Sequence, residues 1–278
     1  MQPYLLNQLR ARLQELGLSA YEDRFLPHAQ LAFDLRLDGA SEGIIGESRW
    51  GGAPDVPVGF EWPMADQTPM TFLAQINLAD LTTDAENPFP QSGWLHFFAD
   101  LENYQPDSGF VTFLRGNAEL HPTQRPSAGN NVGDVPAHRL KLESRADLPQ
   151  WATNDYVELT EDLSDEEQDA YSQLSLSDTY MPTPQRQTLA GQLLGHSAGI
   201  GADPREYAFE RRELGSNYSF EHDNAEHQRG IQNWQNLLRF DSVLNLCIGD
   251  AGYLNFLVHR DALQRLDFTR VVAAVESS

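Results

Sequence analysis

The sequence contains very little cysteine and lysine. Its 278 residues include one cysteine, Cys247, and one lysine, Lys141, so almost all of its 19 basic residues are arginines. A single cysteine excludes an intramolecular disulfide and a zinc site built from cysteines. We expect Cys247, which lies between Leu246 and Ile248 with no basic neighbour, to be a buried and inert thiol. A chain with one thiol also fits a reducing compartment.

Positive charge and long apolar runs are scarce as well. The chain has 41 acidic residues against 19 basic ones, which gives a formal net charge of −22. Such a surface repels nucleic acid and anionic lipid, attracts a basic protein, and also keeps a soluble protein dispersed. No apolar run approaches the roughly 20 residues that a membrane-spanning helix needs, and the N-terminus has no signal-peptide pattern. We therefore expect a cytoplasmic protein that binds neither nucleic acid nor membrane.

The apolar pattern predicts an α+β protein. Residues 3–18 have the leucine spacing of an amphipathic N-terminal helix. Ser164 and Glu167 predict a capped start for a helix within residues 160–174, and shorter helices are expected over 225–236 and 261–266. Apolar or alternating runs predict strands over residues 29–37, 70–76, 93–99, 109–114, 138–143, 155–159, 237–243, 252–259 and 271–275.

Two passages of the chain repeat one pattern. The first passage is a strand over residues 72–77 that ends in Asn, then a loop, then residues 93–98 in the order Gly, aromatic, Leu, polar, Phe, apolar. The second passage is a strand over residues 237–241 that ends in Asp, then a loop, then residues 252–257 in the same order. We interpret them as two related strand pairs, and the short connections favour mainly antiparallel sheets. The sequence thus predicts a single domain over 1–278, with an N-terminal half (about 1–145) and a C-terminal half (about 146–278) around a shared core.

The segment from Gly51 to Trp62 is predicted to be rigid but irregular. Its two leading glycines permit unusual backbone angles, and its prolines fix others. Such a segment either shapes a ligand groove or is a stiff connector that covers a sheet edge, which we favour. If it shapes a groove, the binding residues are expected to be Trp50, Gly51, Gly52, Trp62 and Arg205.

No catalytic, metal or cofactor motif withstands a physical check. Residues 195–199 match the G-x-S-x-G nucleophile elbow around Ser197, but the elbow needs a buried strand before it and a helix after it. Residues 187–194 are poor in strand formers and residues 200–204 resemble a loop, so a glycine-rich turn is favoured. His222 and His227 are five residues apart and make a poor zinc pair, whereas His96 is expected to form an internal hydrogen bond. With no Walker A or dinucleotide fingerprint, we expect neither metal nor cofactor.

Several motifs resemble the YwqG-like family of bacterial proteins. These are GGAPDVPVGFEWP, FLAQINLADL, PFPQSGWLHFFAD, LLGHSAGIGADPRE and GDAGYLNFLVHRDALQRLDFTRV, which together extend from Gly51 to the C-terminus. The resemblance implies a mixed α+β fold, no assigned catalytic residues and, from relatives encoded near toxin–immunity clusters, a protein-binding role. In that family the LLG segment usually continues into an aromatic residue and a proline. Here His196 and Ser197 follow it, which makes the elbow match accidental.

The functional expectation is a non-enzymatic protein-binding module that neutralises a basic partner. The alternative is a hydrolase or a small-ligand-binding protein that uses a groove between the two halves. A hydrolase requires the Ser197 hydroxyl to lie within hydrogen-bonding reach of a histidine. A protein-binding role requires acidic residues that form a contiguous surface.

Overall fold

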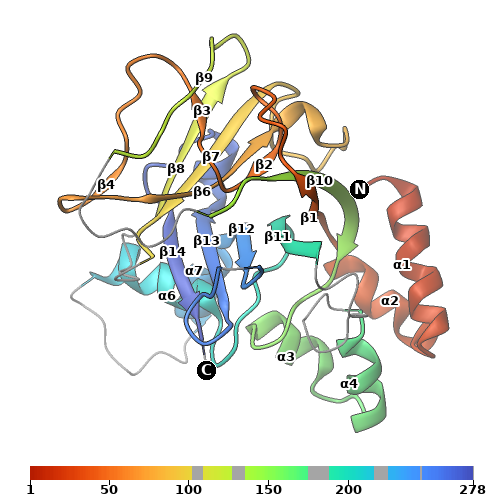
Figure 1. Ribbon diagram of the computed structural model, residues 1–278. Helices are drawn as coiled ribbons and strands as arrows, with labels where there is room; N and C mark the ends of the chain where they lie inside the picture. Colours follow the sequence, from red (N-terminus) through yellow and green to blue (C-terminus); the bar gives the residue numbers. More distant parts are fainter. Residues whose placement is uncertain (102–108, 127–134, 175–187, 216–224, 245, 278) are drawn as a thin grey trace.

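The computed structural model describes residues 1–101, 109–126, 135–174, 188–215, 225–244 and 246–277 (Figure 1). Its centre is a ten-stranded sheet in which every pair of neighbouring strands is antiparallel, in the order β14-β13-β12-β11-β1-β10-β2-β6-β7-β8. The strands of this sheet are β1 (Gln30–Ala40), β2 (Arg49–Trp50), β6 (Thr71–Asn77), β7 (Gly93–Ala99), β8 (Gly109–Arg115), β10 (His138–Asp147), β11 (Leu189–Leu194), β12 (Trp234–Asp241), β13 (Tyr253–His259) and β14 (Val272–Glu276). Two short pairs accompany it: β3 (Asp55–Val56) with β9 (His121–Pro122), and β4 (Met64–Ala65) with β5 (Thr68–Pro69).

One face of the sheet is apolar and encloses the main core. Side chains alternate between the two faces of a strand, so every second residue points inward. The sheet folds over until this face meets itself, because the rings of Phe97 on β7 and Phe256 on β13 lie 5.4 Å apart. The edge strands also approach each other, since a Cβ placed on Gly109 of β8 would lie 2.6 Å from the Cβ of Ala273 on β14. The sheet is therefore nearly closed around its core.

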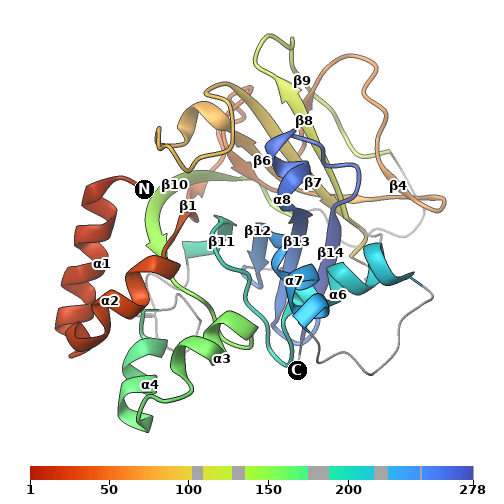
Figure 2. The ribbon, with the colours of Figure 1, turned by 180° about the vertical axis from the view of Figure 1, so that it is seen from behind.

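Four helices form a second, smaller core beside the sheet. These are α1 (Pro3–Glu15), α2 (Glu22–Phe25), α3 (Asn154–Thr160) and α4 (Asp165–Ser172), at the right of Figure 1. They pack on one another through buried apolar side chains, which include Leu13, Phe25, Tyr156 and Tyr171. Seen from behind, α6 (Pro204–Phe209) and α7 (Ala225–Gln232) lie against β12–β14, and α8 (Arg260–Gln264) follows β13 directly (Figure 2). None of the helices in the described ranges combines the length and the apolar character that crossing a bilayer requires.

The structure confirms the α+β class, the mainly antiparallel sheet and the N-terminal helix. Leu5, Leu9 and Leu13 of α1 are buried, as the leucine stripe predicts. The capping box at the start of α4 is also present, because the Ser164 hydroxyl accepts from the Glu167 amide and the Glu167 carboxylate accepts from the Ser164 amide. The prediction that one domain spans residues 1–278 stays a prediction.

Several sequence-based predictions were wrong. The helix expected over residues 225–236 ends at Gln232, and strand β12 begins at Trp234. Residues 155–159 form helix α3 rather than a strand, since the Thr153 hydroxyl caps the helix and accepts from the Tyr156 amide at 3.2 Å. Residues 189–194 form β11, although they were expected to be poor in strand character. All six are buried, so the alternation that identifies a half-exposed strand is missing. Cys247 is exposed although Leu246 and Ile248 are buried.

The two predicted strand pairs have the same register. In β6–β7 the pairing skips Leu73, and in β12–β13 it skips Leu237, so each hairpin has a bulge at the same place in its pattern. After the bulge, Ala74 faces Phe97 in the first hairpin, and Leu238 faces Phe256 in the second. The strands of the C-terminal half, β11–β14, occupy one continuous side of the sheet.

The near closure of the sheet predicts the effect of a single added methyl group. We expect Gly109→Ala to lower the free energy of unfolding by about 1–3 kcal/mol, because its Cβ would overlap Ala273 and Phe256. Gly201→Ala is the matched control, because nothing lies within 4 Å of a Cβ at that position. Equilibrium urea unfolding measures both variants, and equal stability of the two would contradict the close approach of β8 and β14.

Candidate functional site

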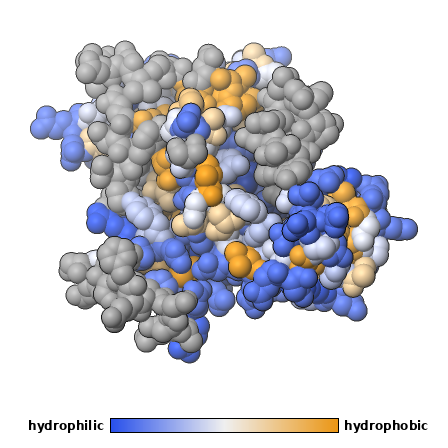
Figure 3. Space-filling view, turned by 90° about the horizontal axis from the view of Figure 1, so that it is seen from below, coloured by the Kyte–Doolittle hydropathy of each residue, from blue (hydrophilic) through white to orange (hydrophobic). Residues whose placement is uncertain are grey.

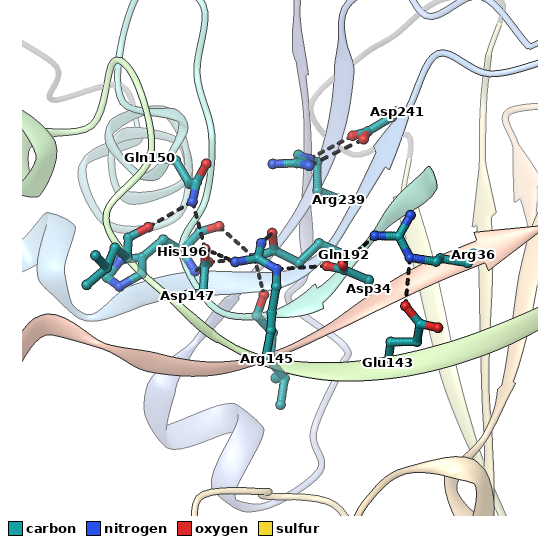
Figure 4. A network of polar contacts seen from close by, with 12 residues as sticks. Asp34, Arg36, Glu143, Arg145, Asp147, Gln150, Gln192, His196, Arg239 and Asp241 are labelled. Atoms are coloured by element: carbon teal, nitrogen blue, oxygen red, sulfur yellow. Dashed lines mark hydrogen bonds and ion pairs between the residues drawn. The ribbon is translucent and has the colours of Figure 1, made fainter. Parts of the chain in front are cut away.

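The outer face of the sheet carries buried charges at its centre. Arg145 on β10 points away from the apolar core and reaches three neighbours (Figure 4). Its Nε donates to Asp34 Oδ1 at 2.8 Å, its Nη1 to Asp147 Oδ1 at 2.6 Å, and its Nη2 to Gln192 Oε1 at 2.6 Å. One guanidinium therefore links β1, β10 and β11. We call these four residues the central network.

Asp147 is the most enclosed member of the central network. Its Oδ2 accepts from the His196 amide at 2.7 Å and from Gln192 Nε2 at 2.8 Å, and its Oδ1 also accepts from Gln150 Nε2 at 2.7 Å. Burial disfavours the charged carboxylate, but the positive charge of Arg145 and the hydrogen bond from His196 outweigh it and hold the pKa of Asp147 below its ordinary value. The carboxylate is thus ionised and saturated with donors. It is built to hold structure and not to exchange a proton.

Further ion pairs extend the central network across the sheet. Arg36 on β1 donates to Glu143 at 2.8 Å and to Asp34 at 3.2 Å. On β12, Arg239 is buried, donates to Asp241 at 2.7 Å, and has its guanidinium carbon 5.1 Å from the centre of the Tyr253 ring. Because each of these arginines has a carboxylate partner, the face has little capacity to bind an added anion.

A second buried network lies under the predicted rigid segment. Asp55 Oδ2 accepts from Arg49 at 2.9 Å and from Gln75 at 2.8 Å, and the Asp55 carbonyl accepts from His96 Nε2 at 2.9 Å. This bond confirms the internal hydrogen bond predicted for His96. Burial lowers the pKa of the His96 imidazole to about 4, and the hydrogen bond to Asp55 opposes this shift only in part. His96 is therefore neutral at physiological pH.

The structure does not bring all the predicted binding residues into one groove. Trp50 is fully buried and packs against Phe240, with the ring centres 4.9 Å apart. Gly51 and Gly52 follow it with φ values of 62° and 72°, which explains the glycines. Trp62 donates to the Met70 carbonyl at 2.9 Å and packs on Phe98.

The remaining predicted binding residue, Arg205, lies at the start of α6. It is buried and pairs with Asp203 at 2.6 Å and with Asp155 at 2.7 Å, so its charge is already neutralised. This ion pair ties α6 to α3.

Ser197 has no base within reach in the described part of the chain. The residue is buried, and its hydroxyl has no hydrogen-bond partner there. The neighbouring His196 ring donates instead to the His28 carbonyl at 2.8 Å. His227 packs on Phe209, His259 lies beside Trp234, and His222 lies outside the described residues. The geometry that a hydrolase requires is not met by these residues.

Helices α3 and α4 present the densest run of exposed acids. Residues 146–185 contain no lysine or arginine. Six acidic residues are exposed here and form what we call the acidic surface: Glu158, Glu161, Asp162, Asp165, Glu166 and Asp169. Two large apolar side chains adjoin it, Trp151 at 57% exposure and Val157 at 55%. In Figure 3 the part of the molecule formed by α1–α4, at the right, is mostly hydrophilic with a few apolar side chains.

Sequence reasoning missed the central network and the acidic surface as a site. Asp34, Arg36, Glu143, Arg145 and Asp147 occupy alternate positions of two strands, and this alternation was a usable signal. Metal binding has no support within the described ranges, where no group of three or more His, Cys, Asp or Glu side chains is arranged to hold an ion.

The fold and the site define an α+β protein whose nearly closed antiparallel sheet carries paired charges on its outer face. The chain belongs to the family described as a domain of unknown function, DUF1963, whose model matches residues 48–276. No curated protein matches the chain.

The buried His96 predicts that stability depends on pH. The unfolded imidazole titrates near pH 6.5 and the folded one near pH 4, so the unfolded state binds more protons between these values. We expect the free energy of unfolding to fall by about 3 kcal/mol from this residue alone as the pH drops from 6.5 to 4. His96→Asn should remove that part of the slope, whereas His121→Asn, which changes an exposed histidine, should not. Urea unfolding at several pH values measures the slopes, and an unchanged slope in His96→Asn would contradict the assignment.

The central network predicts a large difference between two arginines of the same strand. Arg145→Met leaves Asp147 buried without its cation and Asp34 with Arg36 alone, and we expect it to cost about 3–5 kcal/mol of stability. Arg139→Met removes an exposed pair with Asp38 and is expected to cost at most about 1 kcal/mol. Denaturant unfolding measures the free energy of unfolding of both variants. Similar losses of stability in the two variants would mean that the central network contributes no more to stability than an exposed ion pair.

Proposed function

We propose that this protein binds a basic cytoplasmic protein through the acidic surface of α3 and α4, with Trp151 as the apolar anchor. The observation that carries the proposal is the pair of exposed side chains, Trp151 and Val157, set beside six exposed carboxylates. Tryptophan is enriched among the residues that dominate binding energy at interfaces. The surrounding carboxylates would steer a cationic partner toward it and reject acidic proteins.

The acidic surface is held firmly enough to serve as an interface. Arg24 of α2 pairs with Asp162, just before α4, and the Tyr21 hydroxyl, just before α2, donates to Glu167 of α4 at 2.7 Å, so the α2 region supports the start of α4. The Trp151 ring packs edge-on against buried Tyr156, with centres 5.3 Å apart, which restricts its rotation while leaving more than half of it exposed. A pre-positioned aromatic ring loses less entropy when it is buried by a partner.

A charge-matched comparison tests the proposal. Tagged wild-type protein is used to capture proteins from a lysate of the source cell at low and at high salt. The triple variant Glu158→Gln, Glu161→Gln, Asp165→Asn removes three of the six negative charges of the acidic surface. The triple variant Glu42→Gln, Glu61→Gln, Asp250→Asn removes the same charge from exposed positions elsewhere.

We expect the wild type and the second triple variant to retain the same basic protein at low salt and release it at high salt, since salt screens exposed charges over about 10 Å at 0.1 M. The first triple variant should lose it. With the purified partner, Trp151→Ala should raise the Kd by at least about tenfold. Equal retention by both triple variants, or capture of no basic protein, would refute the proposal.

We further propose that the chain is a YwqG-like member of its family and that its two hairpins derive from one ancestral unit. The motifs between Gly51 and the C-terminus support the first point. The second is supported by the shared bulge position and by the matching register of the facing positions in β6–β7 and β12–β13.

A further inference from the structure

A cavity of about 430 Å³ lies between α6 and β14, which lie beside each other in Figure 2. Its wall on the sheet side is formed by four consecutive residues of β14, 273–276. Because successive side chains of a strand point to opposite faces, a cavity that touches four residues in a row lies along the edge of the strand. β14 is the last strand on its side of the sheet, so this edge pairs with no further strand of the described chain.

The wall of this cavity carries carboxylates that no basic side chain neutralises. Glu206 of α6 and Glu276 of β14 both line it, and neither forms an ion pair within the described ranges. Asp203 lines the cavity too, but Arg205 already pairs with it at 2.6 Å. Among the described residues, no arginine, lysine or histidine belongs to the wall. The cavity therefore has a negative charge that a cationic group would neutralise.

Glu276 has a carboxylate in surroundings that disfavour its charge. Burial, and to a smaller extent the charge of Asp203, raise the pKa of Glu276 above its ordinary value, although backbone amides oppose the shift. One of these is the Ile200 amide, which donates to Glu276 Oε2 at 3.0 Å and so fixes the position of the carboxylate. A cation beside Glu276 would stabilise its ionised form.

The rest of the wall suits a long basic side chain. It contains an exposed aromatic ring, Tyr207 at 37% exposure, and the small apolar side chains of Ala202, Ala273, Ala274 and Val275. Arginine can lay its aliphatic stem along an apolar surface while its guanidinium stacks on an aromatic ring, and it does so more often than lysine. Its five N–H donors also allow one guanidinium to bind carboxylates from two elements. The combination favours arginine over lysine.

The cavity is close to the apolar anchor of the acidic surface. The Trp151 carbonyl accepts from the Gly199 amide at 3.2 Å, and the next residue, Ile200, donates to Glu276. Only these few residues separate Trp151 from the cavity. An interface of standard size covers about 800 Å² on each partner, which is wide enough to include both.

We propose that this cavity binds an arginine side chain of another protein, with its aliphatic stem along the alanines of β14 and its guanidinium between Glu206 and Glu276. The inference deepens the function proposed above and rests on it for the partner that supplies the arginine. A second copy of this chain is a poor occupant, because a net charge of −22 makes the two copies repel each other.

A titration of the ¹⁵N-labelled full chain with two small probes, followed by NMR, tests the cavity without any partner protein. N-acetyl-L-arginine amide supplies the cation, and N-acetyl-L-citrulline amide has nearly the same shape without the charge. We expect the arginine probe to bind saturably with a Kd of roughly 1–10 mM and to shift the amides of Ile200 and residues 273–276, and the citrulline probe to bind at least about tenfold more weakly. Equal binding of the two probes, or no saturable binding of the arginine probe, overturns the proposal.

Two variants of equal net charge show whether the binding is local. Glu276→Gln removes the charge and keeps an oxygen that accepts from the Ile200 amide, and we expect it to weaken binding of the arginine probe by about 5- to 10-fold. Glu42→Gln is the matched control, since this exposed acid does not line the cavity and its loss should leave the Kd unchanged. Glu206→Gln repeats the test if Glu276→Gln fails to fold. Equal affinity in the cavity variants and in Glu42→Gln overturns the proposal.

The probe titration and the lysate capture fail separately. If the arginine probe binds as expected but no basic protein is captured, the acidic surface is not the interface proposed above, and the cavity remains an arginine site. If a basic protein is captured through the acidic surface but the arginine probe does not bind, the cavity assignment alone is overturned.

Discussion

The largely buried guanidinium of Arg145 is the constraint on which the middle of the sheet depends. A charge removed from water must be paired and hydrogen-bonded, and Arg145 satisfies this through Asp34, Asp147 and Gln192, which belong to three adjacent strands. The need to pair this charge also fixes the register of the three strands. A slip of β10 by one residue would turn both Arg145 and Asp147 toward the apolar core and separate Arg145 from Asp34 on β1 and Gln192 on β11. The strands at which the two halves of the chain meet, β1 and β11, are thus held in place by polar contacts on one face and apolar contacts on the other.

This constraint extends from the sheet to the surface. Asp147 accepts from the amide of His196, which places the chain after β11 directly over the central network. This placement of the chain requires the turn at Leu194 and Gly195, and the Leu194 carbonyl in that turn orients the Asn236 side chain.

The sequence predicted elements with a strong local signal and failed where the signal was short or hidden. β7 was predicted with its observed boundaries, Gly93–Ala99, because a turn and a long apolar run define it. Residues 155–159 are too few for their apolar pattern to distinguish a strand, with a period of 2 residues, from a helix, with a period of 3.6. The segment is a helix because the Thr153 side chain caps its N-terminus. β11 is buried on both faces and so shows no alternation. The central network was missed because, among 41 acidic residues, proximity in sequence carries little information about pairing.

The two hairpins explain the first glycine of the apparent nucleophile elbow, Gly195. In the first half, the chain leaves β2 through Gly51 and Gly52, and the carbonyl of Asp55 then accepts from His96 of β7.

In the second half, the chain leaves β11 through Leu194 and Gly195 with nearly the same φ values, 59° and 70° against 62° and 72°. The carbonyl of Ala198 then accepts from Asn255, which occupies in β13 the place of His96 in β7. Both turns fold the chain back over the polar face of its hairpin by the same route. Gly195 in the G-x-S-x-G match is therefore accounted for by backbone geometry, and Ser197 lies in this motif as part of a returning turn.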